Sequence, residues 1–161
     1  MKESLKPYRD LEAEKRLKSI IEEIQSLMCD PKNNSAIEDK LKEATQFIKA
    51  PNRVLDLTVI EHYNGWTDLD GLVGELTMEV PVLSTVSKED FLSIVQQIRE
   101  VIKSGQAPDN LRLDYWMDFY RAFFEVNFSN ISNVEDLFDE IFEDTSLNEL
   151  VNIAFPDMSV E

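Results

Sequence analysis

The stretch "SNVEDLFDEIFEDTSLNEL", from Ser132 to Leu150, contains two helix start signals and the period of a helix. Residues 132–135 and 146–149 both follow the capping-box pattern, in which a serine hydroxyl and a glutamate carboxylate satisfy amide groups at a helix start. After the first box, apolar residues recur at the three- and four-residue spacing of an amphipathic helix. They are Val134, Leu137, Phe138, Ile141 and Phe142. The stretch therefore predicts two helices.

Similar start signals occur earlier in the chain. Residues 35–38 form a third full capping box, and residues 87–90 form a near-box with aspartate in the fourth place. Both precede apolar residues at helical spacing, and Gly105 supplies a stop for the second helix. Another amphipathic helix is expected from about residue 9 to Asp30. Because start signals and hydrophobic period agree, we expect a mostly α protein, an irregular helical bundle of about six or seven helices.

Residues 53–83 are compatible with two structures. "VLDLTVIEHY" is rich in β-branched residues and "ELTMEVPVL" alternates with period two, so one small β-hairpin is the alternative, which would make the fold α+β. A helix beginning near Thr67 also fits, although Gly71 and Gly74 weaken it. With 161 residues, no repeat of fixed period and no low-complexity linker, we expect a single helical domain over residues 1–161.

The segment from Leu113 to Val126 is unusually rich in aromatic residues. Placed on a helix at about 100° per residue, its apolar side chains cover more than half of the circumference. Asp118 and Glu125 remain in one narrow polar stripe. The pattern favours a central core helix. The alternative is that aromatic residues such as Tyr115 and Trp116 form part of an exposed partner site, since aromatics are enriched at interface hot spots.

The formal charge of −16 is unevenly distributed. Residues 1–50 hold ten basic and ten acidic residues, whereas residues 51–161 hold six and 22. No basic residue follows Arg121. In the helix expected after residue 133, four carboxylates lie opposite the apolar face and should point to water. They allow two interpretations: a solvated face that confers solubility, or a docking surface for a basic partner.

Few features of the sequence point to catalysis. His62 is the only histidine, so metal sites built from several histidines are excluded, and we expect its side chain to be packed and hydrogen-bonded. No glycine-rich phosphate loop is present. We therefore expect no enzyme, no catalytic residues, no metal and no cofactor.

The sequence also indicates the cellular compartment of the protein and its class of partner. The start of the chain does not have the pattern of a secretory signal, and no apolar run could cross a membrane. Cys29 is the only cysteine, which suits a reducing cytoplasm. The acidic balance disfavours direct binding to nucleic acid or to an anionic membrane. A cytoplasmic protein that binds another protein is the interpretation that remains.

The acidic run Glu135 to Glu149 and the aromatic block Tyr115 to Phe124, in a small acidic chain, resemble bacterial immunity proteins as a class. The resemblance implies a basic protein partner, namely a toxin domain that cleaves nucleic acid, blocked by an acidic and aromatic surface. Phage-encoded inhibitors that mimic nucleic-acid charge fall in the same physical category. The alternative is an acidic helical adaptor or structural subunit with no toxin partner. From the residue pattern, the candidate partner-binding residues are Asp136, Asp139, Glu140, Glu143, Asp118, Glu125, Tyr115 and Trp116.

Overall fold

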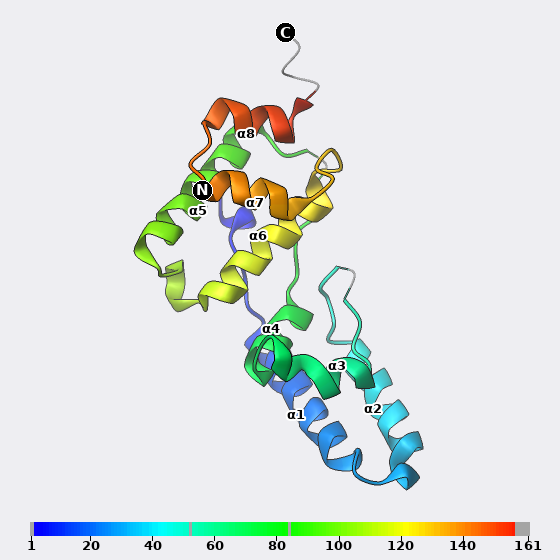
Figure 1. The fold of residues 1–161 in the computed structure, drawn as a ribbon. Helices are drawn as coiled ribbons and strands as arrows, with labels where there is room; N and C mark the ends of the chain where they lie inside the picture. The colour runs from blue at the N-terminus through cyan, green and yellow to red at the C-terminus, as the bar shows by residue number, and fades with distance from the viewer. Residues whose placement is uncertain (1, 52, 84, 157–161) are drawn as a thin grey trace. The chain divides into compact units, whose positions relative to one another are not determined.

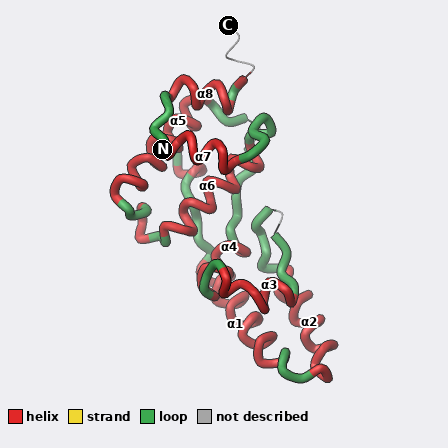
Figure 2. Tube along the Cα trace, viewed as in Figure 1, coloured by secondary structure: helices red, strands yellow, loops and turns green. Residues whose placement is uncertain are grey.

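The computed structural model describes residues 2–51, 53–83 and 85–156. These residues contain eight α-helices, four short 3-10 turns and no β-strand (Figure 2). The predicted mostly α fold is confirmed, with eight helices rather than about six or seven. The helices are α1 (Leu11–Leu27), α2 (Asn34–Thr45), α3 (Leu57–His62), α4 (Leu69–Thr77), α5 (Lys88–Ser104), α6 (Leu113–Asn127), α7 (Val134–Phe142) and α8 (Leu147–Ala154).

The chain divides into two compact units. Unit 1 comprises residues 1–7 and 80–161, and unit 2 comprises residues 8–79. In unit 2, α1 packs against α2 and α4 around a core that includes Leu17, Ile21 and Ile24. In unit 1, α7 packs against α5, α6 and α8 (Figure 1). The single domain over residues 1–161 stays a prediction.

Residues 53–83 form helices and connecting segments, so the hairpin alternative was wrong. Asp56 caps α3 by accepting a hydrogen bond from the amide of Val59 at 2.9 Å. Asp68 caps α4 by accepting from the amide of Gly71 at 2.7 Å. After α4, Met78 and Val80 are buried and Glu79 is exposed, but Val82 is exposed too, and no strand lies beside this segment among the described residues. Aspartate caps therefore start two helices in a region whose side chains also suited strands.

Two of the predicted helix starts are confirmed. The Ser87 hydroxyl accepts a hydrogen bond from the amide of Asp90 at 3.0 Å, and the Ser146 hydroxyl accepts from the amide of Glu149 at 3.3 Å. Gly105 ends α5 with a φ of 71°, the left-handed conformation that favours glycine. These signals involve only residues close in sequence, which explains why the sequence alone predicted them.

Two other predicted starts are displaced. α7 is capped by Asn133, one residue after Ser132, because asparagine is as good a cap as serine. Ser35 lies inside the first turn of α2 and does not cap it. A 3-10 turn (Pro31–Asn33) leads directly into α2, and Asp30 caps this turn by accepting from the amide of Lys32 at 2.9 Å. The helical turn therefore begins before the serine that was expected to start it.

This difference predicts unequal effects of two serine substitutions. Ser87→Ala removes the cap of α5 and should lower the free energy of unfolding by about 1 kcal/mol. Ser35→Ala removes an exposed hydroxyl within α2 and should change it by less than about 0.5 kcal/mol. Urea unfolding followed by circular dichroism measures both. Equal losses would contradict the observed start of α2.

Candidate functional site

α7 is held on α6 by a cluster of aromatic side chains. Phe124 of α6 and Phe138 of α7 are fully buried, and their ring centroids lie 5.7 Å apart. Leu137 and Ile141 are buried on the same face of α7. The apolar face predicted for this helix is confirmed at these three α7 positions. It fixes which side of α7 points to solvent.

The structure confirms the core helix that the pattern favoured, and it corrects the alternative in which Tyr115 and Trp116 are exposed. Both side chains are buried in unit 1, and Trp116 is only 1% exposed. Its ring contacts that of Tyr120, with centroids 4.7 Å apart. A helix that is apolar over more than half of its circumference packs on more than one side, so these residues belong to the core. Their assignment as partner-binding residues therefore lacks the exposed surface that it assumed.

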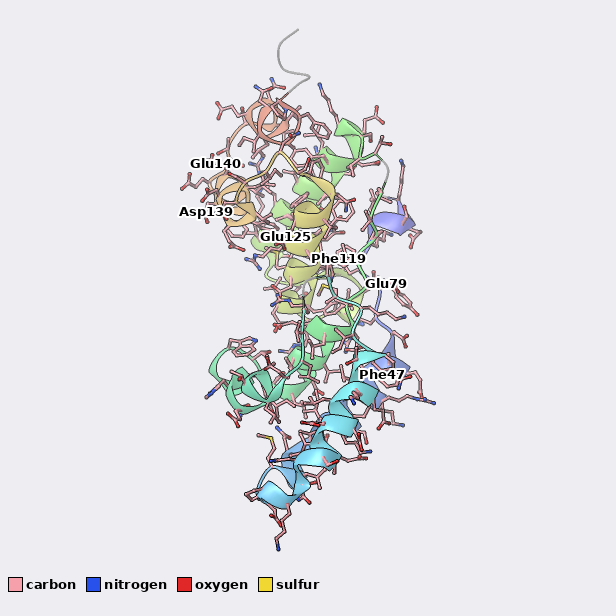
Figure 3. All side chains as sticks on the ribbon, turned by 90° about the vertical axis from the view of Figure 1, so that its right-hand side faces the viewer. Phe47, Glu79, Phe119, Glu125, Asp139 and Glu140 are labelled. Atoms are coloured by element: carbon pink, nitrogen blue, oxygen red, sulfur yellow. The ribbon has the colours of Figure 1, made fainter. Side chains whose placement is uncertain are left out.

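The polar side of α7 carries the four carboxylates that the sequence placed there. Asp136, Asp139 and Glu143 are exposed, and none forms a hydrogen bond or an ion pair through its carboxylate with another described residue. Glu140 is half-buried and accepts a hydrogen bond from the Thr145 hydroxyl at 2.6 Å. Figure 3 shows Asp139 and Glu140 at the outer edge of unit 1. Asp136 and Asp139 of α7 and the residue that ends it, Glu143, therefore present three uncompensated negative charges to water.

Unlike Asp136, Asp139 and Glu143, several acidic side chains in each unit pair with lysine or arginine. The hydrogen bond to Asp70 raises the pKa of Lys18, and the hydrogen bond to Glu23 raises the pKa of Lys40. Unit 2 holds nine basic and 15 acidic residues, whereas unit 1 holds seven and 17. The excess of acid is thus greater in the unit that carries α7. The ion pairs of unit 2 include Arg9–Glu14, Arg16–Glu12, Lys18–Asp70, Lys40–Glu23 and Lys49–Glu79.

Arg121 of α6 pairs with two acidic side chains, Asp118 of α6 and Glu135 of α7. Its Nη1 donates to Asp118 at 3.2 Å, and its Nε lies 2.9 Å from a carboxylate oxygen of Glu135. The Nε contact is an ion pair without hydrogen-bond alignment. The guanidinium group also lies 5.0 Å from the centroid of the Phe138 ring. Asp118 is therefore compensated, while Glu125, about two turns further along α6, is exposed.

Phe142 is an exposed aromatic residue that the sequence pattern had placed on the buried face. Its side chain is 44% exposed, and its ring packs against that of Phe138 with centroids 5.8 Å apart. Asp139 lies three residues before it, so the two share one side of the helix. In the sequence, only its position near the end of the predicted helix could have indicated that Phe142 is exposed. We define the α7 acidic surface as Asp136, Asp139, Glu140, Phe142 and Glu143.

The C-terminal end of α7 is fixed by Arg99 of α5. The Arg99 Nε donates to the carbonyl of Ile141 at 3.1 Å, and Nη2 donates to the carbonyl of Thr145 at 2.6 Å. A cation at this end also interacts favourably with the negative end of the helix dipole. Asp144, with a φ of 63°, turns the chain away after the helix. α7 is therefore anchored to α5 as well as to α6.

We expect Arg99→Ala to lower the free energy of unfolding of unit 1 by about 2 kcal/mol, because it leaves two carbonyl groups without their charged donor. Lys103→Ala changes an exposed cation on the same helix and is the matched control, with an expected effect below about 0.5 kcal/mol. Urea unfolding gives both values. Similar effects of the two substitutions would show that Arg99 does not anchor α7.

Other chemistry-bearing residues do not assemble into a second site. The His62 side chain is 70% exposed, which corrects the expectation that it is packed. Within residues 2–51, 53–83 and 85–156, no three His, Cys, Asp or Glu side chains are arranged to hold a metal ion. No helix in these ranges is both long and apolar enough to cross a membrane.

The chain matches no protein-family model, and neither a curated protein nor a solved structure matches it. The candidate site is therefore argued from its own geometry and charge.

Proposed function

We propose that this protein is an inhibitor that binds a basic protein through the α7 acidic surface, as an immunity protein binds a nuclease-type toxin. One observation carries the proposal: Asp136, Asp139 and Glu143 are exposed without a cationic partner among the described residues. Like charges at this spacing destabilise a helix slightly, and surfaces normally offset them with interspersed lysines. A basic partner would supply the missing positive charge.

The chemistry of the surface suits the active site of a nuclease. A protein that binds the phosphate backbone does so through a basic patch. Carboxylates spaced along one helix face would occupy that patch and exclude nucleic acid. A field of single sign also accelerates the encounter and discriminates against acidic competitors. Phe142 adds an apolar contact at the edge of the charged area. Inhibition of this kind needs no catalytic residue and no cofactor.

The burial of Tyr115 and Trp116 favours a second candidate function. With these two α6 side chains buried, Phe142 is the one exposed aromatic side chain among the described residues of unit 1. An acidic helical adaptor or structural subunit needs charge for solubility and no aromatic blockade. This alternative predicts that substitutions on the α7 acidic surface leave the protein's associations unchanged.

The test begins with the gene immediately upstream. If it encodes a basic nuclease, that nuclease is purified and its cleavage of nucleic acid is measured with increasing amounts of this protein. We expect cleavage to stop near an equimolar ratio, and the Asp139→Lys, Glu143→Lys variant to require a clear excess. Full cleavage in the presence of excess wild-type protein, or an upstream gene for an unrelated acidic protein, would contradict the proposal and favour the adaptor.

A further inference from the structure

Residues 2–7 belong to unit 1, although the next 72 residues of the chain, 8–79, form unit 2. Their only regular structure is a 3-10 turn, Glu3–Leu5. A turn of this length is not stable by itself in water, because so few hydrogen bonds cannot offset the conformational entropy lost. The conformation of residues 2–7 therefore depends on their docking to the rest of unit 1.

Three contacts dock this segment. The Leu5 side chain is 1% exposed. The Tyr120 hydroxyl of α6 donates a hydrogen bond to the carbonyl of Leu5 at 2.9 Å. The Lys2 ammonium lies 3.2 Å from a carboxylate oxygen of Asp90 in the first turn of α5. The segment is thus held by the two helices on which α7 rests.

At neutral pH, the Tyr120 hydroxyl and the Asp90 carboxylate are in the protonation states that their contacts require. Burial raises the pKa of the Tyr120 hydroxyl, so the group remains protonated and able to donate. Burial also raises the pKa of Asp90, but hydrogen bonds from Lys2 and Ser87 outweigh it, and the pKa lies below its ordinary value. Asp90 therefore stays negatively charged beside Lys2.

We propose that residues 2–7 form a latch that opens while α5, α6 and α7 remain folded. A segment held by one apolar side chain, one buried hydrogen bond and one partly exposed ion pair opens at a lower free energy than the core beneath it.

Thiol labelling tests the latch in the full chain. Leu5→Cys and, separately, Ile98→Cys are made in a Cys29→Ser background, because Cys29 is exposed and would react itself. Ile98 of α5 is fully buried and reports unfolding of the helices. We expect the thiol at position 5 to react at least about tenfold faster with a disulfide reagent, and with a weaker dependence on urea, because latch opening exposes little surface. Equal rates with equal urea dependence would overturn the proposal.

Amide hydrogen exchange in the protein with its native Leu5 provides a second measurement, since Leu5→Cys itself weakens docking. The amides of Leu5 and Lys6, bonded to the carbonyls of Lys2 and Glu3, should exchange faster than that of Ile98. Tyr120→Phe should speed their exchange about fivefold, the effect of one lost hydrogen bond. The control is Tyr63→Phe, which removes a hydroxyl bonded to Gln25 within unit 2 and should have no effect there. No change with Tyr120→Phe would contradict the latch.

Discussion

Trp116→Ala should lower the free energy of unfolding of unit 1 by about 3–5 kcal/mol. The side chain is 1% exposed and packs against Tyr120, so its removal leaves a large cavity in the aromatic core. Such a loss is a large fraction of the stability of an ordinary domain, about 5–15 kcal/mol. Circular dichroism in urea measures it without relying on the fluorescence of Trp66, which lies in unit 2.

Phe142→Ala is the matched control for this prediction. Because Phe142 is 44% exposed, its truncation should cost about 1 kcal/mol or less of stability. If the α7 acidic surface binds a partner, the same truncation should speed dissociation of the complex. A Phe142→Ala loss as large as that of Trp116→Ala would contradict the burial pattern of unit 1.

Features set by neighbouring residues could be predicted from the sequence. The starts of α5 and α8 at Ser87 and Ser146 are confirmed, because a cap and its amide lie within three residues. The end of α5 at Gly105 follows from the same kind of local geometry. The polar face of α7 was also predicted, since the helical period alone separates its carboxylates from its apolar side chains.

Features set by tertiary packing could not be predicted. Tyr115 and Trp116 have the same helical spacing whether a second layer of the unit covers them or not. Phe142 differs from its buried neighbour Phe138 only through its position at the end of α7. Residues 53–83 suited both strands and helices, and a strand would have needed a partner strand, which the described residues do not provide. In each case the deciding contact is not contained in the local pattern.

Reversing two charges on α7 should have the largest effect on association. Asp139→Lys together with Glu143→Lys changes only exposed side chains, so the fold should stay intact and relief of like-charge repulsion should stabilise α7 slightly. The rate constant of association with a basic partner should fall by about 10- to 100-fold at low ionic strength, because the reversal removes electrostatic steering.

The matched control is Glu38→Lys together with Asp39→Lys on α2 of unit 2. These residues are also exposed, and the pair changes the net charge of the protein by the same amount. If charge acts through its position on α7, this control should associate at nearly the native rate. A similar slowing in both variants would mean that the total charge of the protein matters rather than the α7 acidic surface.

The most direct measurement is the rate constant of association with the basic partner as a function of salt. Wild-type protein and the α7 reversal are compared from about 0.05 to 0.5 M salt, a range over which exposed charges become screened. The account predicts a steep fall with salt for the wild type, a shallow dependence for the reversal, and convergence of the two at high salt. Native association rates for the reversal across the whole range would show that the acidic face only solvates the protein.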